Sequence, residues 1–174
     1  MFEIRPATGP DVPAIHRLAE QWVLQGLSSK EARDYGFLVS NFTPAEYRRF
    51  TQIANAFYVL EHEGQVEAFI LAFTDDRISP DDPVSLSVYD CESGRFLLVK
   101  QICSRRGGGV RGAATELYRF VSQEFSGVPQ YAAIVLEPEN VRSIHFHEQR
   151  GFARCFERDA PDGRRRGIWA KRPA

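Results

Sequence analysis

Apolar residues near the N-terminus recur at the three- and four-residue spacing of an amphipathic helix. The stripe that predicts this first helix comprises Val12, Ile15, Leu18, Ala19, Trp22 and Val23. Thr8, followed by Asp11 three residues later, has the spacing of a capping box at the helix start. Thr43 and Glu46 flank a proline and predict the start of a second helix. Residues 24–42 between the two are irregular and long for a connector, so we expect them to form a wall of a site.

Further runs have the length and the apolar or aromatic content of strands. These runs are residues 2–5, 57–60, 66–73, 96–103, 131–136 and 167–171. The second and third are separated by a polar turn and predict an antiparallel hairpin, and a closing hairpin is predicted to start at Phe152 and return in the last run. Residues 74–95 are rich in Asp, Ser and Pro and predict an exposed loop.

Composition excludes several classes of protein. The 174 residues, 43% hydrophobic and 26% charged, are typical of one globular domain spanning residues 1–174. A net charge of -1 disfavours a dedicated nucleic-acid or anionic-membrane binder. Three widely spaced cysteines favour reduced thiols in a cytoplasm, and the four histidines lack the spacing of a zinc site. No signal-peptide pattern and no membrane-spanning stretch is present, so we expect a cytoplasmic protein without a metal.

Residues 98–121 join a buried-strand pattern, a glycine-rich turn with arginines and an amphipathic helix. Such a turn leaves backbone N–H groups free and adds the positive end of a helix, so it favours an anion such as a diphosphate. The sequence lacks the Gly-Lys-Ser/Thr of a Walker loop. Taken alone, three consecutive glycines are equally typical of a flexible surface turn.

A second motif follows the next predicted strand. Residues 140–152 have the form N-x-x-S-x-x-F-H-x-x-x-G-F. With the glycine turn, the hairpin and the opening residues 4–8, this motif makes the sequence resemble the GNAT acetyltransferase superfamily over nearly its whole length. The resemblance implies a single-domain α/β fold: a mixed, mostly antiparallel central sheet of about six or seven strands, about four flanking helices, and strands that splay apart near the cofactor.

The resemblance also aligns the glycine turn. The family pattern is Arg/Gln-x-x-Gly-x-Gly/Ala, and counting back from Leu117 places Gly112 and Ala114 at the two small positions. Gly109 then stands where the family has Arg or Gln, which is a departure from the pattern. An alternative frame that begins at Arg106 fits less well, because it puts an arginine at a small-residue position.

The family's binding mode implies acetyl-CoA as cofactor and coenzyme A as product. Backbone N–H groups between Val110 and Thr115 would bind the pyrophosphate, and the strand that ends near Ser104 would expose main-chain groups to the pantetheine arm. Asn140 and Ser143 can equally be a helix cap and a small packing residue. The implied cofactor contacts are Ile102, Cys103, Ser104, Gly109, Val110, Arg111, Gly112, Ala113, Ala114, Thr115, Asn140, Ser143, Phe146 and His147.

The implied reaction transfers an acetyl group from a thioester to a neutral amine. It needs a backbone N–H for the oxyanion, an acceptor for the proton of the amine, and an acid for the thiolate. His147 stands at the place of the family's tyrosine acid, and the alternative is a packed histidine that only contacts the cofactor. Glu137 is the candidate base, with Glu61 and Glu67 as weaker candidates. Cys103 is better interpreted as a buried small residue than as a nucleophile.

Three classes of function follow from these patterns. The leading hypothesis is an N-acetyltransferase that moves an acetyl group to a primary amine of a small molecule or peptide, in a ternary complex. The departure at Gly109 motivates an alternative, a catalytically silent acyl-CoA-binding regulatory module. A weaker hypothesis makes the arginine clusters an RNA contact surface, although no nucleic-acid partner is expected from the charge. The sequence leaves the acceptor and the oligomeric state open, a homodimer included.

Overall fold

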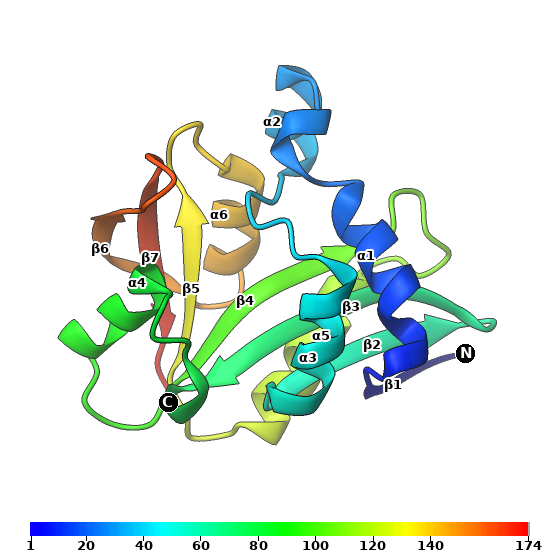
Figure 1. Cartoon of the computed structure of the whole chain (residues 1–174), viewed down its shortest axis with the longest axis horizontal. Helices are drawn as coiled ribbons and strands as arrows, with labels where there is room; N and C mark the ends of the chain where they lie inside the picture. Colours follow the sequence, from blue (N-terminus) through cyan, green and yellow to red (C-terminus); the bar gives the residue numbers. More distant parts are fainter. Residues whose placement is uncertain (174) are drawn as a thin grey trace.

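The computed structural model describes residues 1–173, which build one seven-stranded sheet (Figure 1). The strands lie in the order β1-β2-β3-β4-β5-β7-β6, and every neighbouring pair is antiparallel except β4 and β5. The strands are β1 Phe2–Pro6, β2 Ala56–His62, β3 Gln65–Thr74, β4 Leu97–Ser104, β5 Gln130–Val135, β6 Ala153–Asp159 and β7 Arg165–Lys171. The predicted apolar runs therefore lie in strands, and the mixed, mostly antiparallel sheet is confirmed.

The described residues form six α-helices, where about four were expected. They are α1 Val12–Glu20, α2 Ser29–Tyr35, α3 Pro44–Ile53, α4 Pro83–Leu86, α5 Ala113–Glu124 and α6 Val141–Glu148. The two additional helices, α2 and α4, lie in segments expected to be irregular, and both are too short to show apolar periodicity. Each is stabilised by its cap: Ser28 and Glu31 form a capping box on α2, and Asp82 accepts the N–H of Ser85 on α4. No helix of residues 1–173 is long and apolar enough to cross a membrane.

The helices cover both faces of the sheet (Figure 1). On one face, α5 packs Leu117 and Val121 against the small and aliphatic side chains of β3, and α6 packs beside it. On the other face, α1 and α3 enclose an aromatic core around the fully buried Tyr47. The short helix α4 extends this second layer toward β5 and β7 through Val84. The three-layer arrangement explains why β3 and β4 are buried on both sides.

Strands β4 and β5 part from each other halfway along β4. They pair only where Leu97–Val99 run beside Gln130–Ala132, although both strands continue beyond this point. Lys100 is also skipped in the register with β3, because Gln101 pairs with Leu71 and Val99 pairs with Ala72. A bulge of this kind bends its strand and increases the local twist. The predicted splay is confirmed, and it leaves backbone groups of β4 beyond Val99 without a partner on the β5 side.

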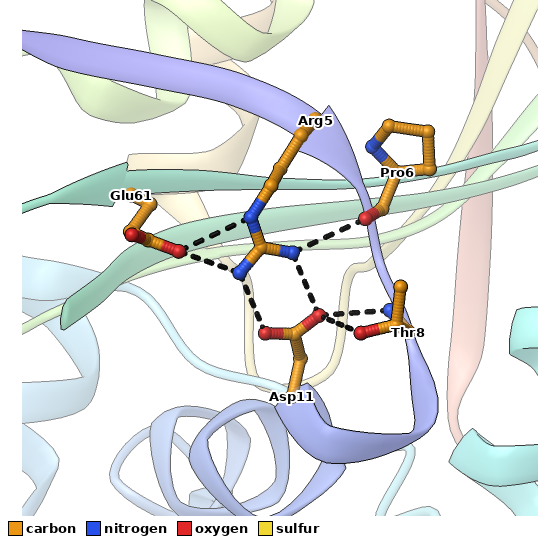
Figure 2. A network of polar contacts seen from close by, with 5 residues as sticks. All are labelled: Arg5, Pro6, Thr8, Asp11 and Glu61. Atoms are coloured by element: carbon orange, nitrogen blue, oxygen red, sulfur yellow. Dashed lines mark hydrogen bonds and ion pairs between the residues drawn. The ribbon is translucent and has the colours of Figure 1, made fainter. Parts of the chain in front are cut away.

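A polar network fixes the N-terminus to the sheet (Figure 2). Arg5 on β1 donates two hydrogen bonds of 2.8 Å to the carboxylate of Asp11 and two, of 3.1 and 2.5 Å, to Glu61 on β2. Asp11 also accepts from the backbone N–H and the hydroxyl of Thr8 at 2.8 and 2.7 Å. The paired Arg5 and these donors lower the pKa of Asp11 to about 2. The predicted capping pair of Thr8 and Asp11 is present, and Glu61 belongs to this network at the sheet edge.

Candidate functional site

The turn between β4 and α5 forms a cradle of free backbone N–H groups. Gly112, at φ 77°, takes the left-handed conformation that glycine adopts without strain and turns the chain into α5. Among the described residues, no acceptor bonds the six amides of Val110–Thr115, whereas the N–H of Glu116 bonds the carbonyl of Gly112. Free amides at the positive end of a helix attract an anion. We name residues 110–115 the amide cradle.

The amide cradle opens into a cleft of about 1320 Å³ that follows the gap between β4 and β5. Strand β4, the start of α5, strand β5 and helix α6 all contribute to its wall. The structure thus brings together most of the residues that the two motifs singled out. Those lining the cleft are Ile102, Cys103, Ser104, Val110, Gly112, Ala113, Ala114, Thr115, Asn140, Ser143, Phe146 and His147. Gly109, Arg111 and Glu137 are not in its wall.

Glu137 does not reach the cleft. It is exposed in the turn that follows β5, where a bridge between Leu136 and Glu139 reverses the chain. Its backbone carbonyl accepts a hydrogen bond from Arg164 at 3.2 Å. The expectation of a base at the end of β5 is therefore corrected, because Val135 is the last cleft-lining residue of the strand and the chain turns away after it.

His147 lies in the cleft wall with both ring nitrogens engaged. Nδ1 is 2.7 Å from the carbonyl oxygen of Ser143, and Nε2 is 2.7 Å from the hydroxyl of Tyr118 on α5. Burial lowers the pKa of His147 to about 4, so the ring is neutral at pH 7. Of the two interpretations of His147, acid or packed residue, this geometry favours the packed residue, which holds α5 against α6.

The amide oxygen and the amide nitrogen of Asn140 both bond protein groups. Its Oδ1 accepts the N–H of Ser143 at 3.4 Å as the cap of α6, and its Nδ2 donates to the carbonyl of Phe37 at 2.9 Å. Gly36 approaches so closely that a Cβ there would lie 3.1 Å from Oδ1. Asn140 thereby ties the segment after α2 to α6, and the predicted helix cap is present, while the contact with the cofactor stays a prediction.

The β4 residues that line the gap differ in character. Ile102 and Ser104 are half-buried toward the α5 side, and the Ser104 carbonyl accepts the indole N–H of Trp22 at 2.8 Å. Cys103 is buried in the core beneath α1 and α3, and burial raises the pKa of its thiol. Cys103 is therefore a small core residue, as its sequence context indicated.

Two of the three arginines near the turn are already paired. Arg105 lies 3.4 Å from the carboxylate of Glu67, and Arg106 bonds Glu31 at 2.9 Å and lies over the rings of Trp22 and Tyr35. These contacts attach α2 to the turn, so residues 24–42 do form a wall of the cleft. Arg111 is exposed and has no ion pair within residues 1–173.

Two residues whose position the sequence did not predict, Arg150 and Glu67, also line the cleft. Arg150 stacks over Phe146, 3.4 Å from the ring centroid, and donates to the hydroxyl of Thr115 in the amide cradle. Its charge beside the cradle has only a weak sequence signal, a basic residue directly before Gly151. Glu67 lies beneath the glycine turn, where its carboxylate accepts the N–H of Gly109 at 2.9 Å.

The far part of the cleft, on the α3 and α4 side, combines apolar walls with ion pairs. Phe50 stacks edge-on with Phe42 and Phe73, at centroid distances of 5.0 and 5.5 Å. Lys100, the bulged residue of β4, pairs with Asp82, whose pKa is lowered: burial opposes the shift but the charge of Lys100 and its hydrogen bonds outweigh it. Within the described chain, no cluster of three His, Cys, Asp or Glu side chains could hold a metal ion.

Comparison with solved structures identifies the fold. A GNAT-family acetyltransferase from Streptococcus agalactiae superposes with a TM-score of 0.72, over 99% of this chain and 96% of that chain, at 16% identity. Ard1 from Thermoplasma volcanium gives 0.70 over 99% and 98% at 13% identity, and Arabidopsis thaliana NAA60, solved in complex with acetyl-CoA, gives 0.66 over 99% and 98% at 11%. No protein-family model and no curated protein sequence matches the chain. The chain has the GNAT fold, as the two motifs implied.

Proposed function

We propose that this protein is an acetyl-CoA-dependent N-acetyltransferase. The observation that carries the proposal is the amide cradle: six N–H groups without a protein acceptor lie at the start of α5, beside the gap between β4 and β5. A pyrophosphate fits such a cradle, because it satisfies several amides at once and lies at the positive end of the helix. The small side chains of Ala113 and Ala114 leave the approach open.

The gap between β4 and β5 suits the rest of the cofactor. Backbone N–H and C=O groups of β4 beyond Val99 have no partner on β5, so they can bond the amides of a pantetheine arm. Acetyl-CoA, when bound, supplies a thioester carbon that an amine can attack. The chain's own contribution is to orient both reactants and to aim a free backbone N–H of β4 at the thioester carbonyl, where negative charge develops.

The acceptor in this proposal is a primary amine of a small molecule or peptide, and the protein acts in the cytoplasm. The solved neighbours span both kinds of acceptor by name, because they include a ribosomal-protein-S18-alanine N-acetyltransferase from Escherichia coli and an agmatine N-acetyltransferase. The cleft beyond Lys100 offers an aromatic wall and carboxylates, which suit an amine attached to an apolar or peptide body. Because Asp82 and Asp162 are held in ion pairs, a water relay is the favoured route for the amine proton.

Calorimetric titration of coenzyme A, together with a thiol-release assay, tests the proposal. We expect saturable binding of coenzyme A and acetyl-CoA, and release of free thiol when a panel of polyamines, amino acids, aminoglycosides and short peptides is added. Binding without release over the whole panel would instead indicate the silent acyl-CoA-binding module. Absence of binding would reject both functions.

A further inference from the structure

Glu67 is a buried carboxylate at an irregularity of the sheet. Leu60 pairs with Ala68 while Glu61 pairs with Val66, so Glu67 is the extra residue of a bulge in β3. Its exposed fraction is only 5%. A buried carboxylate is retained in a fold only when charged or hydrogen-bonded partners compensate its lost hydration. Its partners therefore show what it holds in place.

All of its partners belong to the turn that leads into the amide cradle. One carboxylate oxygen accepts the N–H of Gly109 at 2.9 Å, and the other lies 3.4 Å from Nε of Arg105. The backbone of Glu67 adds a second link, since its carbonyl accepts the N–H of Arg105 at 2.6 Å. Glu67 thus holds the turn at both ends, at Arg105 and at Gly109.

Gly108 lies between these two anchors, and the same carboxylate favours glycine at this position. A Cβ on Gly108 would lie 2.2 Å from Oε2 of Glu67, so a side chain there would displace this carboxylate. A Cβ on Gly109 would meet nothing closer than the ring of His62 at 3.5 Å. There is therefore room for a side chain at Gly109. The group that holds the turn at this position is its backbone N–H, which donates to Glu67.

We infer that Glu67 is a positioning residue for the cofactor, which fixes the turn so that the amides of Val110–Thr115 stay free and convergent. The inference rests on the proposed function and explains the departure at Gly109. A main-chain bond to a buried carboxylate orders the turn here, in place of a long side chain at position 109. Because Gly109 lies outside the amide cradle, the bond to Glu67 and the binding of a diphosphate do not compete for the same N–H groups.

Two acyl donors distinguish this role from general structural support. Acetyl-CoA carries the pyrophosphate, whereas S-acetylpantetheine carries only the arm and the thioester. For Glu67→Ala we expect kcat/KM with acetyl-CoA to fall about tenfold or more, as for loss of a charge-assisted hydrogen bond, and kcat/KM with S-acetylpantetheine to change less than threefold. Glu67→Gln keeps an oxygen that can accept the N–H of Gly109, so its donor preference should stay within threefold of wild type.

Glu61→Ala, which removes the neighbouring carboxylate of the hairpin, is the matched control and should leave the donor preference unchanged. Equal losses with both donors in a folded Glu67→Ala protein would overturn the inference, and so would an unchanged affinity for coenzyme A. If Glu67→Ala does not fold, Glu67→Gln and calorimetry with coenzyme A decide. A carboxylate that opposes the diphosphate, rather than supporting the turn, would make Glu67→Gln bind coenzyme A more tightly than wild type. A wild-type protein that binds no coenzyme A would instead reject the proposed function itself.

Discussion

The hydroxyl of Tyr118 on α5 lies 2.7 Å from Nε2 of His147 on α6, and this contact defines the protonation of the histidine. The carbonyl of Ser143 can only accept, so Nδ1 carries the ring proton and Nε2 is the acceptor of the tyrosine O–H. Both groups are buried. Because both nitrogens of this neutral histidine bond groups of the protein, the geometry favours the packed interpretation, and the acid role stays a prediction that the pH dependence below tests.

The first prediction concerns the stability of this pair. The pKa of His147 is lowered to about 4 in the folded protein, against about 6.5 in the unfolded chain. Between these values only the unfolded state takes up the proton, so the wild-type free energy of unfolding should fall as the pH drops from about 6.5 to about 4, by on the order of 3 kcal/mol. His147→Phe should lack this decrease. Urea unfolding at pH 7, 5.5 and 4.5 measures it.

His147→Phe should also be less stable than wild type at pH 7, by about 1–3 kcal/mol, because the buried hydroxyl of Tyr118 loses its acceptor. His147→Gln is the control, since its amide oxygen can accept that O–H. If thiol release by wild type depended on a group that titrates near pH 6.5 and this dependence vanished in His147→Gln, the packed reading would be wrong and the acid role would stand.

A second prediction addresses the amide cradle. Ala114 lines the cleft at the first turn of α5, so Ala114→Glu places a negative charge beside the bound diphosphate. We expect the Kd of coenzyme A to rise about tenfold or more relative to Ala114→Gln, which has the same length without the charge. A carboxylate at this position favours the helix itself, so thermal stability should not fall with the affinity. Calorimetry at two salt concentrations would show the difference shrinking with salt, and equal affinities of the two variants would contradict the placement of the pyrophosphate.

The sequence predicted the glycine turn and the start of α5 well because their signal is local. Glycines, a helix start and the paired apolar residues of α5 lie within one short segment, and the fold leaves their order unchanged. The position of Glu67 beneath the glycine turn could not be predicted in this way, since the facing of a hairpin residue depends on a bulge between β2 and β3. Glu137 was placed wrongly for a related reason: the position where β5 ends, and so the direction of its next side chain, is set by the turn after Val135.

The N-terminal network supplies a third prediction. Arg5, and then the Thr8 donors, lower the pKa of Asp11 to about 2 despite its burial, so this carboxylate stabilises the fold above about pH 4 and the contribution is lost as the pH falls toward 2. Asp11→Asn should lower the free energy of unfolding at pH 7 by on the order of 2 kcal/mol, and the difference from wild type should close near pH 2. Chemical unfolding across this range measures the effect. The affinity for coenzyme A should be unchanged, because the network lies at the β1 edge of the sheet, away from the gap between β4 and β5 (Figure 1).

The last prediction separates the two ends of the cleft. Asp82 and Lys100 pair at the bulge where β4 leaves β5, on the face of the sheet that α3 and α4 cover. Asp82→Asn keeps an oxygen for the N–H of Ser85 and so preserves the cap of α4, but it removes one of the negative charges that line this part of the cleft. We expect the KM of the amine to rise about five- to tenfold, with the Kd of coenzyme A within twofold of wild type, because a carboxylate in the acceptor pocket attracts a cationic amine before it loses its proton.

Asp90→Asn is the matched control for that change. Asp90 pairs with Arg158 at the surface, away from the cleft wall, and its loss should alter neither constant. A parallel weakening of amine and coenzyme A binding in Asp82→Asn would mean that the Lys100 pair supports the splay of β4 rather than the acceptor. Lys100→Met then decides between the two roles: at an acceptor site the freed carboxylate of Asp82 would strengthen amine binding alone, and loss of a support for the strand would weaken the binding of both ligands.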